Sequence, residues 1–178
     1  MLKKIFVLFT FVLLLTTSVC LASPSNDRWE WLSSNDTCSF YFDKNTVKFG
    51  TKEQINNATY TFHKTLDKSK IVVFIKTVYT DASREHMAGQ AEAAGLYELA
   101  EITLNTEYVI RKYEFDYTNR LLRSTGGAWY DSSGNLLIQQ NDFAHWGDIL
   151  PNSNAEHWAE VIHSYTMKNY DEISSRTI

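Results

Sequence analysis

The residue types most able to do chemistry in this chain are its five histidines and the carboxylates near them. In the last predicted helix, Glu156, Glu160 and His163 recur at a spacing that places them on one helix face. His157 lies three residues before Glu160, and His145 lies in the loop before the helix. Because imidazole and carboxylate groups bind zinc, His145, His157 and Glu160 could serve a metal-binding or hydrolytic enzyme.

The sequence favours a charged, solvent-facing helix surface over such a site. Metal sites usually carry a dense signature, and the chain has no His-Glu-x-x-His, no His-x-His and no cysteine pair. It also lacks a Gly-x-Ser-x-Gly nucleophile turn and a glycine-rich phosphate loop. We therefore expect no catalytic residue, no metal site and no cofactor, and we keep the enzyme as the alternative interpretation.

The first 22 residues are typical of an export signal. Lys3 and Lys4 form a basic start, an apolar run covers residues 5–15, and small and polar residues lead to Ala22. The apolar run is shorter than the roughly 20 residues that cross a bilayer. We therefore predict a signal peptide over residues 1–22 and a location in the periplasm, at the cell surface or outside the cell.

The two cysteines bear on processing and on stability. Cys20 could carry lipid, but Thr17 and Val19 replace the Leu and the small residue of the lipidation signal, so we favour cleavage after Ala22. The mature chain then keeps only Cys38, which cannot close an internal disulfide. Its apolar neighbours predict a buried, unreactive thiol.

Size and charge limit the classes of partner. Removing 22 of 178 residues leaves 156, which fits a single domain over residues 23–178. The loss of Lys3 and Lys4 lowers the net charge from −4 to −6. Because Lys and Arg drive binding to phosphates, this charge argues against a nucleic-acid partner and against an anionic membrane surface. A protein or envelope partner remains.

Aromatic residues make up 14% of the chain and include five tryptophans. Most should lie in the core, because a domain without disulfides needs the large area that each ring buries. Trp31 and Trp129 are the exceptions, and we predict them as candidate contacts to a partner protein, since Trp often anchors interfaces.

Alternating apolar and β-branched residues predict antiparallel strands along most of the mature chain. Gly126–Gly127 predicts a bulge or a bend, residues 50–57 a loop, and residues 66–69 a turn. The run over 70–79 is apolar on both faces, so it should be central in its sheet. The predicted strands cover residues 29–33, 38–43, 47–49, 58–64, 70–79, 108–117, 120–130 and 136–138.

Two helices complete the predicted α+β fold. Asp81–Leu99 should form a shorter helical insertion in the middle, which Gly95 ends or interrupts. Residues 154–169 should form a C-terminal helix that begins with a capping box of Ser153 and Glu156 and packs on the antiparallel sheet. The stripe that should face the core consists of Trp158, Val161, Ile162 and Tyr165.

Four short motifs follow one another along the chain: Trp29, the aromatic strand and turn over residues 40–47, the turn over residues 130–134, and the stretch 146–156. Their order resembles the bacterial surface-adhesin protein E family. The best match is the stretch 146–156 before the last helix, and the likeness spans most of residues 29–165. The chain departs from the family where Tyr60 and Phe62 replace a Trp, in the helical stretch 81–99, and in lacking a late cysteine pair. The residues that carry the resemblance are Trp29, Tyr41, Asp43, Tyr130, Gly134, Trp146, Ile149, Pro151, Ser153 and Glu156.

The resemblance implies a small antiparallel sheet with a C-terminal helix, exported to the periplasm or the cell surface. It further implies a non-enzymatic binding module whose role is adhesion to host proteins and which is able to form a homodimer. The ten matching residues are expected to be structural, because none of them belongs to a matched binding loop.

Overall fold

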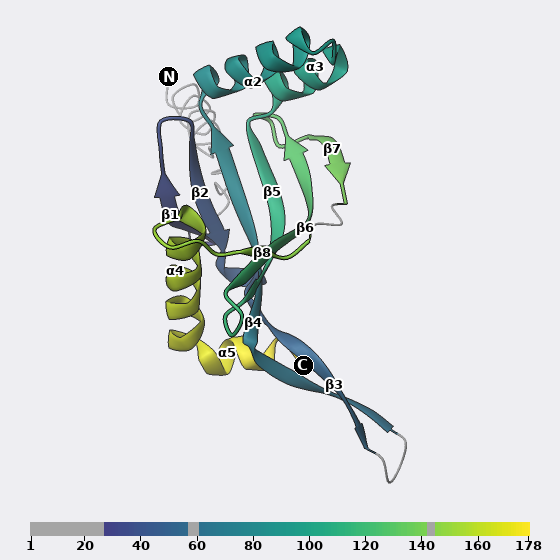
Figure 1. Ribbon diagram of the computed structural model, residues 1–178, viewed down its shortest axis with the longest axis vertical. Coiled ribbons are helices and arrows are strands. Elements are labelled where there is room, and N and C mark those ends of the chain that lie inside the picture. Colours follow the sequence, from purple (N-terminus) through teal and green to yellow (C-terminus); the bar gives the residue numbers. More distant parts are fainter. Residues whose placement is uncertain (1–26, 57–60, 142–144) are drawn as a thin grey trace, which may run out of the picture.

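The computed structural model describes residues 27–56, 61–141 and 145–178. The predicted signal peptide and its cleavage site lie outside these residues. An eight-stranded sheet forms the body, in the order β1-β2-β4-β5-β6-β7, with β3 pairing to β4 and β8 to β6 (Figure 1). The strands, all paired antiparallel, are β1 (Trp29–Ser34), β2 (Cys38–Asp43), β3 (Lys48–Asn56), β4 (Thr61–Tyr79), β5 (Tyr108–Asp116), β6 (Leu121–Tyr130), β7 (Leu136–Gln140) and β8 (Gly147–Asp148).

The helices lie at two places around this sheet (Figure 1). α2 (Asp81–Ala93) and α3 (Tyr97–Asn105) form a hairpin at one end of the strands, and α4 (Asn154–Lys168) and α5 (Tyr170–Ser175) lie against one face. A single 3-10 turn, η1 (Lys44–Thr46), links β2 to β3. The predicted α+β fold, with a C-terminal helix on an antiparallel sheet and a middle helical insertion, is confirmed.

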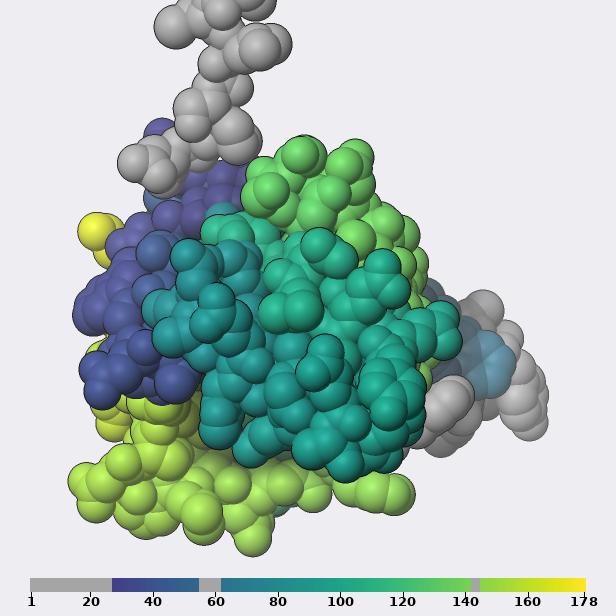
Figure 2. Space-filling view, turned by 90° about the horizontal axis from the view of Figure 1, so that it is seen from above, coloured from purple at the N-terminus to yellow at the C-terminus, as the bar shows by residue number. Residues whose placement is uncertain are grey.

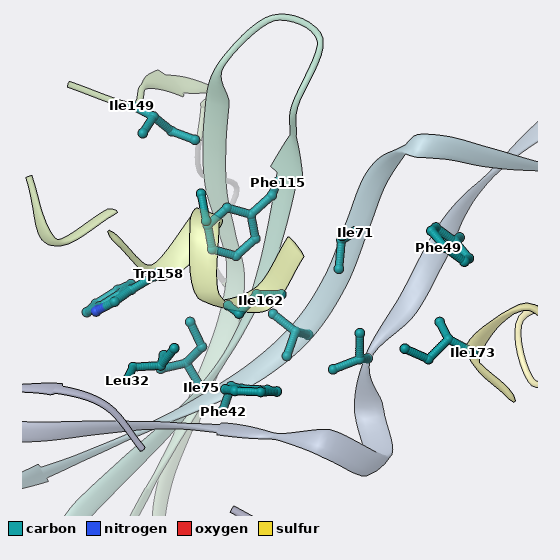
Figure 3. Close-up of a cluster of buried hydrophobic side chains, with 13 residues drawn as sticks. Leu32, Phe42, Phe49, Ile71, Ile75, Phe115, Ile149, Trp158, Ile162 and Ile173 are labelled. Atoms are coloured by element: carbon teal, nitrogen blue, oxygen red, sulfur yellow. The ribbon is translucent and has the colours of Figure 1, made fainter. Parts of the chain in front are cut away.

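The core is formed where the apolar stripe of α4 meets the sheet (Figure 3). Ile162 is fully buried, and the ring of Trp158 lies 4.6 Å from that of Phe40. The predicted stripe is therefore confirmed as the contact between helix and sheet. The buried cluster consists of Leu32, Phe42, Val47, Phe49, Ile71, Val73, Ile75, Phe115, Ile149, Trp158, Ala159, Ile162 and Ile173.

Helix α4 and the buried cluster lie on one face of the sheet only, among the residues described. Successive side chains of a strand point to opposite faces, so Ile75 faces α4 and Phe74 faces away from it. Ile75 is 1% exposed, whereas Phe74 is 36% exposed. The described helices α4 and α5 pack on the side of Ile75, in one cluster with Ile71 and Val73. We call the side of Phe74 the open face.

The long strand β4 differs from the sequence prediction. It runs through residues 66–69, where a turn was predicted, and β3 pairs with it across most of the predicted loop 50–57. The polar residues bend the strand rather than reverse it: the register shifts between Phe49 and Gly50, and a Cβ on Gly50 would lie 2.8 Å from that of Lys70. Of the predicted strand 58–64, residues 58–60 lie outside the described residues.

The helices also differ in detail from the prediction. The predicted helix 81–99 is two helices, because Gly95 adopts a φ of +76° and the Leu96 amide bonds back to the Ala91 carbonyl at 2.9 Å. The capping box is only half formed: the Glu156 amide donates to Ser153 Oγ at 3.2 Å, but the Glu156 carboxylate accepts from the Asn152 amide at 2.7 Å. The short helix α5 was not predicted.

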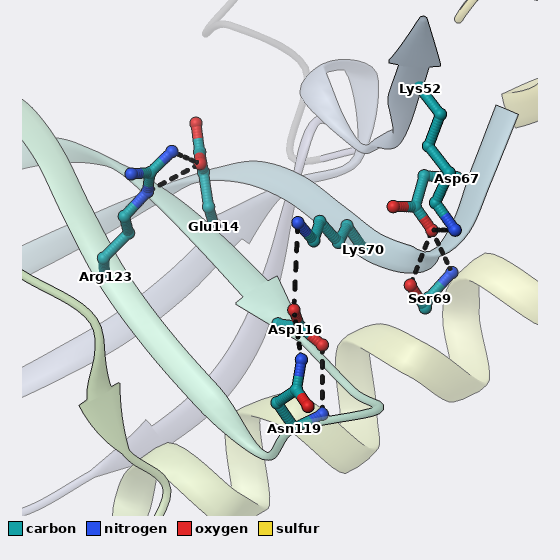
Figure 4. A network of polar contacts seen from close by, with 8 residues as sticks. All are labelled: Lys52, Asp67, Ser69, Lys70, Glu114, Asp116, Asn119 and Arg123. Atoms are coloured by element: carbon teal, nitrogen blue, oxygen red, sulfur yellow. Dashed lines mark hydrogen bonds and ion pairs between the residues drawn. The ribbon is translucent and has the colours of Figure 1, made fainter. Parts of the chain in front are cut away.

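Two buried carboxylates hold the bends of the sheet (Figure 4). Asp67 accepts from the Ser69 hydroxyl at 2.5 Å and pairs with Lys52 at 3.1 Å. Asp116 accepts from the Asn119 amide at 3.0 Å at the β5–β6 turn, and Lys70 lies 3.8 Å away. Burial opposes ionisation of both groups, but these hydrogen bonds and charges outweigh it and lower the pKa of each carboxyl.

The Ile162→Ala variant tests the packing of α4. Removing a fully buried side chain from the centre of the cluster should lower the free energy of unfolding by about 2–5 kcal/mol. Met167→Ala removes a side chain that is 40% exposed on the same helix, so it should cost far less. Urea unfolding of the two variants measures the difference, and equal losses would contradict the packing described.

The two carboxylates predict how stability depends on pH. Their folded-state pKa values lie below the unfolded value of about 3.9, so their contribution is complete above that pH and is lost as the pH falls through the folded values. The free energy of unfolding should therefore decrease below about pH 4, and less steeply in Asp116→Asn. Asp36→Asn, at an exposed turn, is the control for removing a carboxylate that is not buried. A parent chain with pH-independent stability down to pH 2 would refute this.

Candidate functional site

The open face carries a lysine set among aromatic rings. Lys76 Nζ lies 4.7 Å from the ring centre of Trp29, 5.5 Å from that of Tyr108 and 5.6 Å from that of Tyr41. The rings come from β1, β5 and β2, and they meet because the register pairs Tyr41 with Lys76 and because alternate residues share a face. We call this group the Lys76 cluster.

Lys76 carries a positive charge that forms no ion pair with any described residue. It is therefore a source of positive potential on the open face. Burial is the main cause that lowers its pKa, and the nearby Arg28 charge adds to the effect. Ring contacts with a cation contribute about 0.5–1 kcal/mol each at exposed sites, so they offset only part of the desolvation. The Lys76 ammonium group therefore has no counter-charge among the described residues, and an anionic group of a ligand can pair with it.

Two shallow hollows continue the open face beside this cluster, with volumes of about 290 Å³ and 410 Å³. Both are lined by Phe74 and Lys112, so these two side chains form the ridge between them. The predicted bulge at Gly126–Gly127 is confirmed, since the register moves from Gly127 to Ser124 opposite Lys112. Gly126, with a φ of +143°, also lines the smaller hollow.

Charge on the ridge is partly neutralised. Lys112 Nζ lies 3.4 Å from the Glu114 carboxylate, which also accepts from Arg123 Nε at 2.8 Å. Arg123 in turn lies over the ring of Trp146 at 4.5 Å. Two cations therefore share one carboxylate, and the open face keeps an excess of positive charge among its aromatic side chains. This arrangement suits a partner that presents carboxylates and apolar groups together.

The two tryptophans predicted as partner contacts lie on opposite faces. Trp31 pairs with Tyr41, so it belongs to the open face, where it is 58% exposed. Trp129 pairs with Val109, whose side chain points to the other face. It is half-buried there under the α2–α3 hairpin, with Arg111 4.8 Å from its ring centre. The structure thus exposes Trp31 and does not bring Trp129 to the same surface.

Three of the resemblance residues lie at the β1–β2 edge. Trp29 and Tyr41 form part of the Lys76 cluster. Asp43 is fully buried, pairs with Arg28 at 2.6 Å, and accepts from the Asn45 amide at 3.0 Å to begin the 3-10 turn. The first two therefore contribute to the candidate surface, whereas Asp43 fixes the path of the chain.

Most of the other resemblance residues shape turns and the start of α4. Tyr130 stacks on Tyr108 with ring centres 5.0 Å apart, and Gly134 adopts a φ of +82° in the β6–β7 turn. Ile149 is buried in the core, and Pro151 is exposed. The remaining three are Trp146, beneath Arg123, and the helix-capping pair Ser153 and Glu156.

A smaller hollow of about 170 Å³ adjoins the helix carboxylates and His163. The Tyr117 hydroxyl donates to the Ala159 carbonyl at 2.9 Å, and burial raises the pKa of this phenol well above its usual value. Glu156 is engaged by Arg120 at 2.5 Å, whereas Glu160 and His163 are exposed. The phenol is thus kept protonated.

The residues of the enzyme alternative are not gathered at one point. His157 Nε2 donates to the Leu32 carbonyl at 3.0 Å, which gives it a structural role between α4 and β1. His145 is exposed in the loop before β8. Within residues 27–56, 61–141 and 145–178, no three His, Cys, Asp or Glu side chains are placed to hold a metal ion.

In comparisons with known proteins, no protein-family model, no curated protein and no solved structure matches this chain. Of the helices described, none is both long enough and apolar enough to cross a membrane. Phe74, Lys76 and Lys112 were not predicted from the sequence as site residues. The run 70–79 held one signal: its odd-numbered residues supply the core, so Phe74 and Lys76 fall on the other face of the strand.

Lys76→Met separates the surface chemistry of Lys76 from its part in stability. Because the folded state disfavours the charged form, the variant should be as stable as the parent chain or slightly more stable, within about 1 kcal/mol. Chemical denaturation at neutral pH gives this number. A loss above 2 kcal/mol would mean that the ring contacts stabilise the fold and would remove the reason to assign Lys76 to binding.

Proposed function

We propose that this chain is an exported, non-enzymatic binding module whose open face holds a protein or envelope partner. The observation that carries the proposal is the uncovered sheet face, on which Trp31 and Phe74 are exposed beside the Lys76 cluster. Exposed aromatic side chains next to cations are the composition enriched at protein interfaces.

The shape of this face favours binding over catalysis. Enzyme sites are usually deep, with several polar groups that converge on one point. Here the hollows beside Phe74 and Lys112 are shallow, and Lys112 is already paired with Glu114. A broad surface of this kind fits an extended partner that brings carboxylates to Lys76 and apolar side chains to Phe74.

Export and adhesion belong to the same proposal. The basic and apolar start of the chain supports removal of residues 1–22 and a location in the periplasm, at the cell surface or outside the cell. The resemblance to the surface-adhesin protein E family supports adhesion to host proteins and a homodimer as the more specific roles. The hydrolase or metal-enzyme alternative has less support, since His157 bonds to the Leu32 carbonyl and no metal-binding group of side chains is found among the described residues.

Site-specific photo-crosslinking in producing cells tests the proposal. A benzophenone amino acid placed at Phe74 should form adducts with a partner, whereas the same group at Met167 should not. The two positions are a matched pair, since their side chains are 36% and 40% exposed on opposite sides of the sheet. Adding Lys76→Glu should abolish the adducts, because it reverses the charge that faces the partner.

Two results would contradict the proposal. Equal adducts at both positions would show contact without a preferred face, and the absence of adducts at Phe74 would leave the open face without a partner. The same preparations report export, since the mass of the chain should correspond to a start at Ser23. A chain that retains residues 1–22 in the cytoplasm would refute the exported role.

A further inference from the structure

A second, separate apolar surface lies between α3 and β7. A groove of about 570 Å³ is lined on one side by the start of α3 and on the other by Ile138. Four of its side chains are well exposed: Leu96 at 53%, Tyr97 at 73%, Leu99 at 50% and Ile138 at 39%. Figure 2 looks onto this end of the molecule, with the teal hairpin beside the green β6–β7 region. We call this hollow the α3–β7 groove.

The surroundings of the groove are acidic. Glu98 lines the groove and Glu101 lies one turn further along α3, and among the described residues neither carboxylate forms an ion pair. The single hairpin cation, Arg84, is already engaged by Asp81 and Glu107. β7, with the sequence Leu-Leu-Ile-Gln-Gln, contributes no charge. The groove therefore combines apolar walls with uncompensated negative charge, opposite in sign to the open face.

β7 also offers an unpaired backbone edge. It pairs with β6 on one side and with no other described strand. Edge strands present free amide and carbonyl groups, and proteins usually protect them with charges, bulges or covering elements. The opposite edge, β1, has such protection: it carries Glu30, its register shifts after Trp31, and Trp158 Nε1 donates to Ser33 at 2.9 Å. β7 has no charged residue in its place.

We propose that an extended segment of a partner protein adds to the sheet along β7. Its main chain would pair with the β7 edge, and its alternate apolar side chains would enter the α3–β7 groove. A Lys or Arg that faces the same side of the added strand as these apolar residues would approach the carboxylates of Glu98 and Glu101, which supplies the charge complementarity. The occupant is thus an extended segment that combines apolar and basic side chains on one of its two faces. This site goes beyond the proposed open-face function and does not depend on it.

Fluorescence anisotropy with short labelled peptides tests this site on the full mature chain. The probe is a capped peptide in which Leu and Lys occupy the groove-facing positions in turn and Thr occupies the positions between them. A second peptide replaces Lys by Glu, and a third has the composition of the first but places Leu at helical spacing. The first peptide should bind at least about tenfold more tightly than the other two. Hydrogen exchange should slow in Leu136–Gln140 when it binds.

Matched variants locate the binding. Ile138→Asp should lower the affinity for the Lys peptide by about tenfold. Leu150→Asp, at a side chain that is 62% exposed outside the groove, should not change this affinity. Glu98→Lys should lower the affinity by a similar factor, and Glu53→Lys, on the outer part of β3, should leave it unchanged.

Three outcomes would overturn the inference: no measurable binding of the Lys peptide, equal binding of the three peptides, or equal effects of the groove variants and their controls. Phe74→Ala on the open face distinguishes the two proposals, since it should leave this peptide unaffected. Loss of peptide binding in Phe74→Ala alone would move the peptide to the open face and refute the groove site.

Discussion

The packing of α4 on one face of the sheet forms the core and decides which side of each strand is buried. Ile162 and Trp158 close a cluster whose sheet side is built from alternate residues of the strands, such as Phe42 and Ile75. The described part of the chain has no disulfide, since Cys38 is a free, buried thiol. Burial of apolar area therefore has to supply the stability, at about 25 cal/mol per Å². Because the amphipathic helix α4 covers one face of the sheet, the side chains on the opposite side of each strand stay available for contacts with a partner.

The uncovered face shows how a half-covered sheet remains compatible with water. Its aromatic side chains are interleaved with cations, as at Lys76 among Trp29, Tyr41 and Tyr108, and at Arg123 over Trp146. The α2–α3 hairpin carries the opposite charge. The two surfaces are therefore suited to partners of opposite charge, and the net charge of the whole chain describes neither of them.

Local patterns in the sequence were sufficient for most of the fold. Spacing within a few residues predicts three features that the structure contains. These are the stripe from Trp158 to Tyr165, the adjacent strands β5 and β6, and the bulge at Gly126–Gly127. The course of β4 through residues 66–69 did not, because polar residues there satisfy one another, as Asp67 and Ser69 do, and bend a strand instead of ending it. The surface sites depend on register between distant strands, so Lys76 gave no sign of the three rings around it, and Trp31 and Trp129 gave none of lying on opposite faces.

Solvent paramagnetic relaxation enhancement, measured by NMR with a neutral gadolinium chelate, tests the one-sided packing most directly. We expect strong broadening of Phe74 and Trp31 and little broadening of Ile75, Phe42 and Ile162, although Phe74 and Ile75 are neighbours in one strand. Equal broadening of Phe74 and Ile75, or strong broadening of Ile162, would contradict it, since either result would mean that α4 does not cover one face and leave the other accessible.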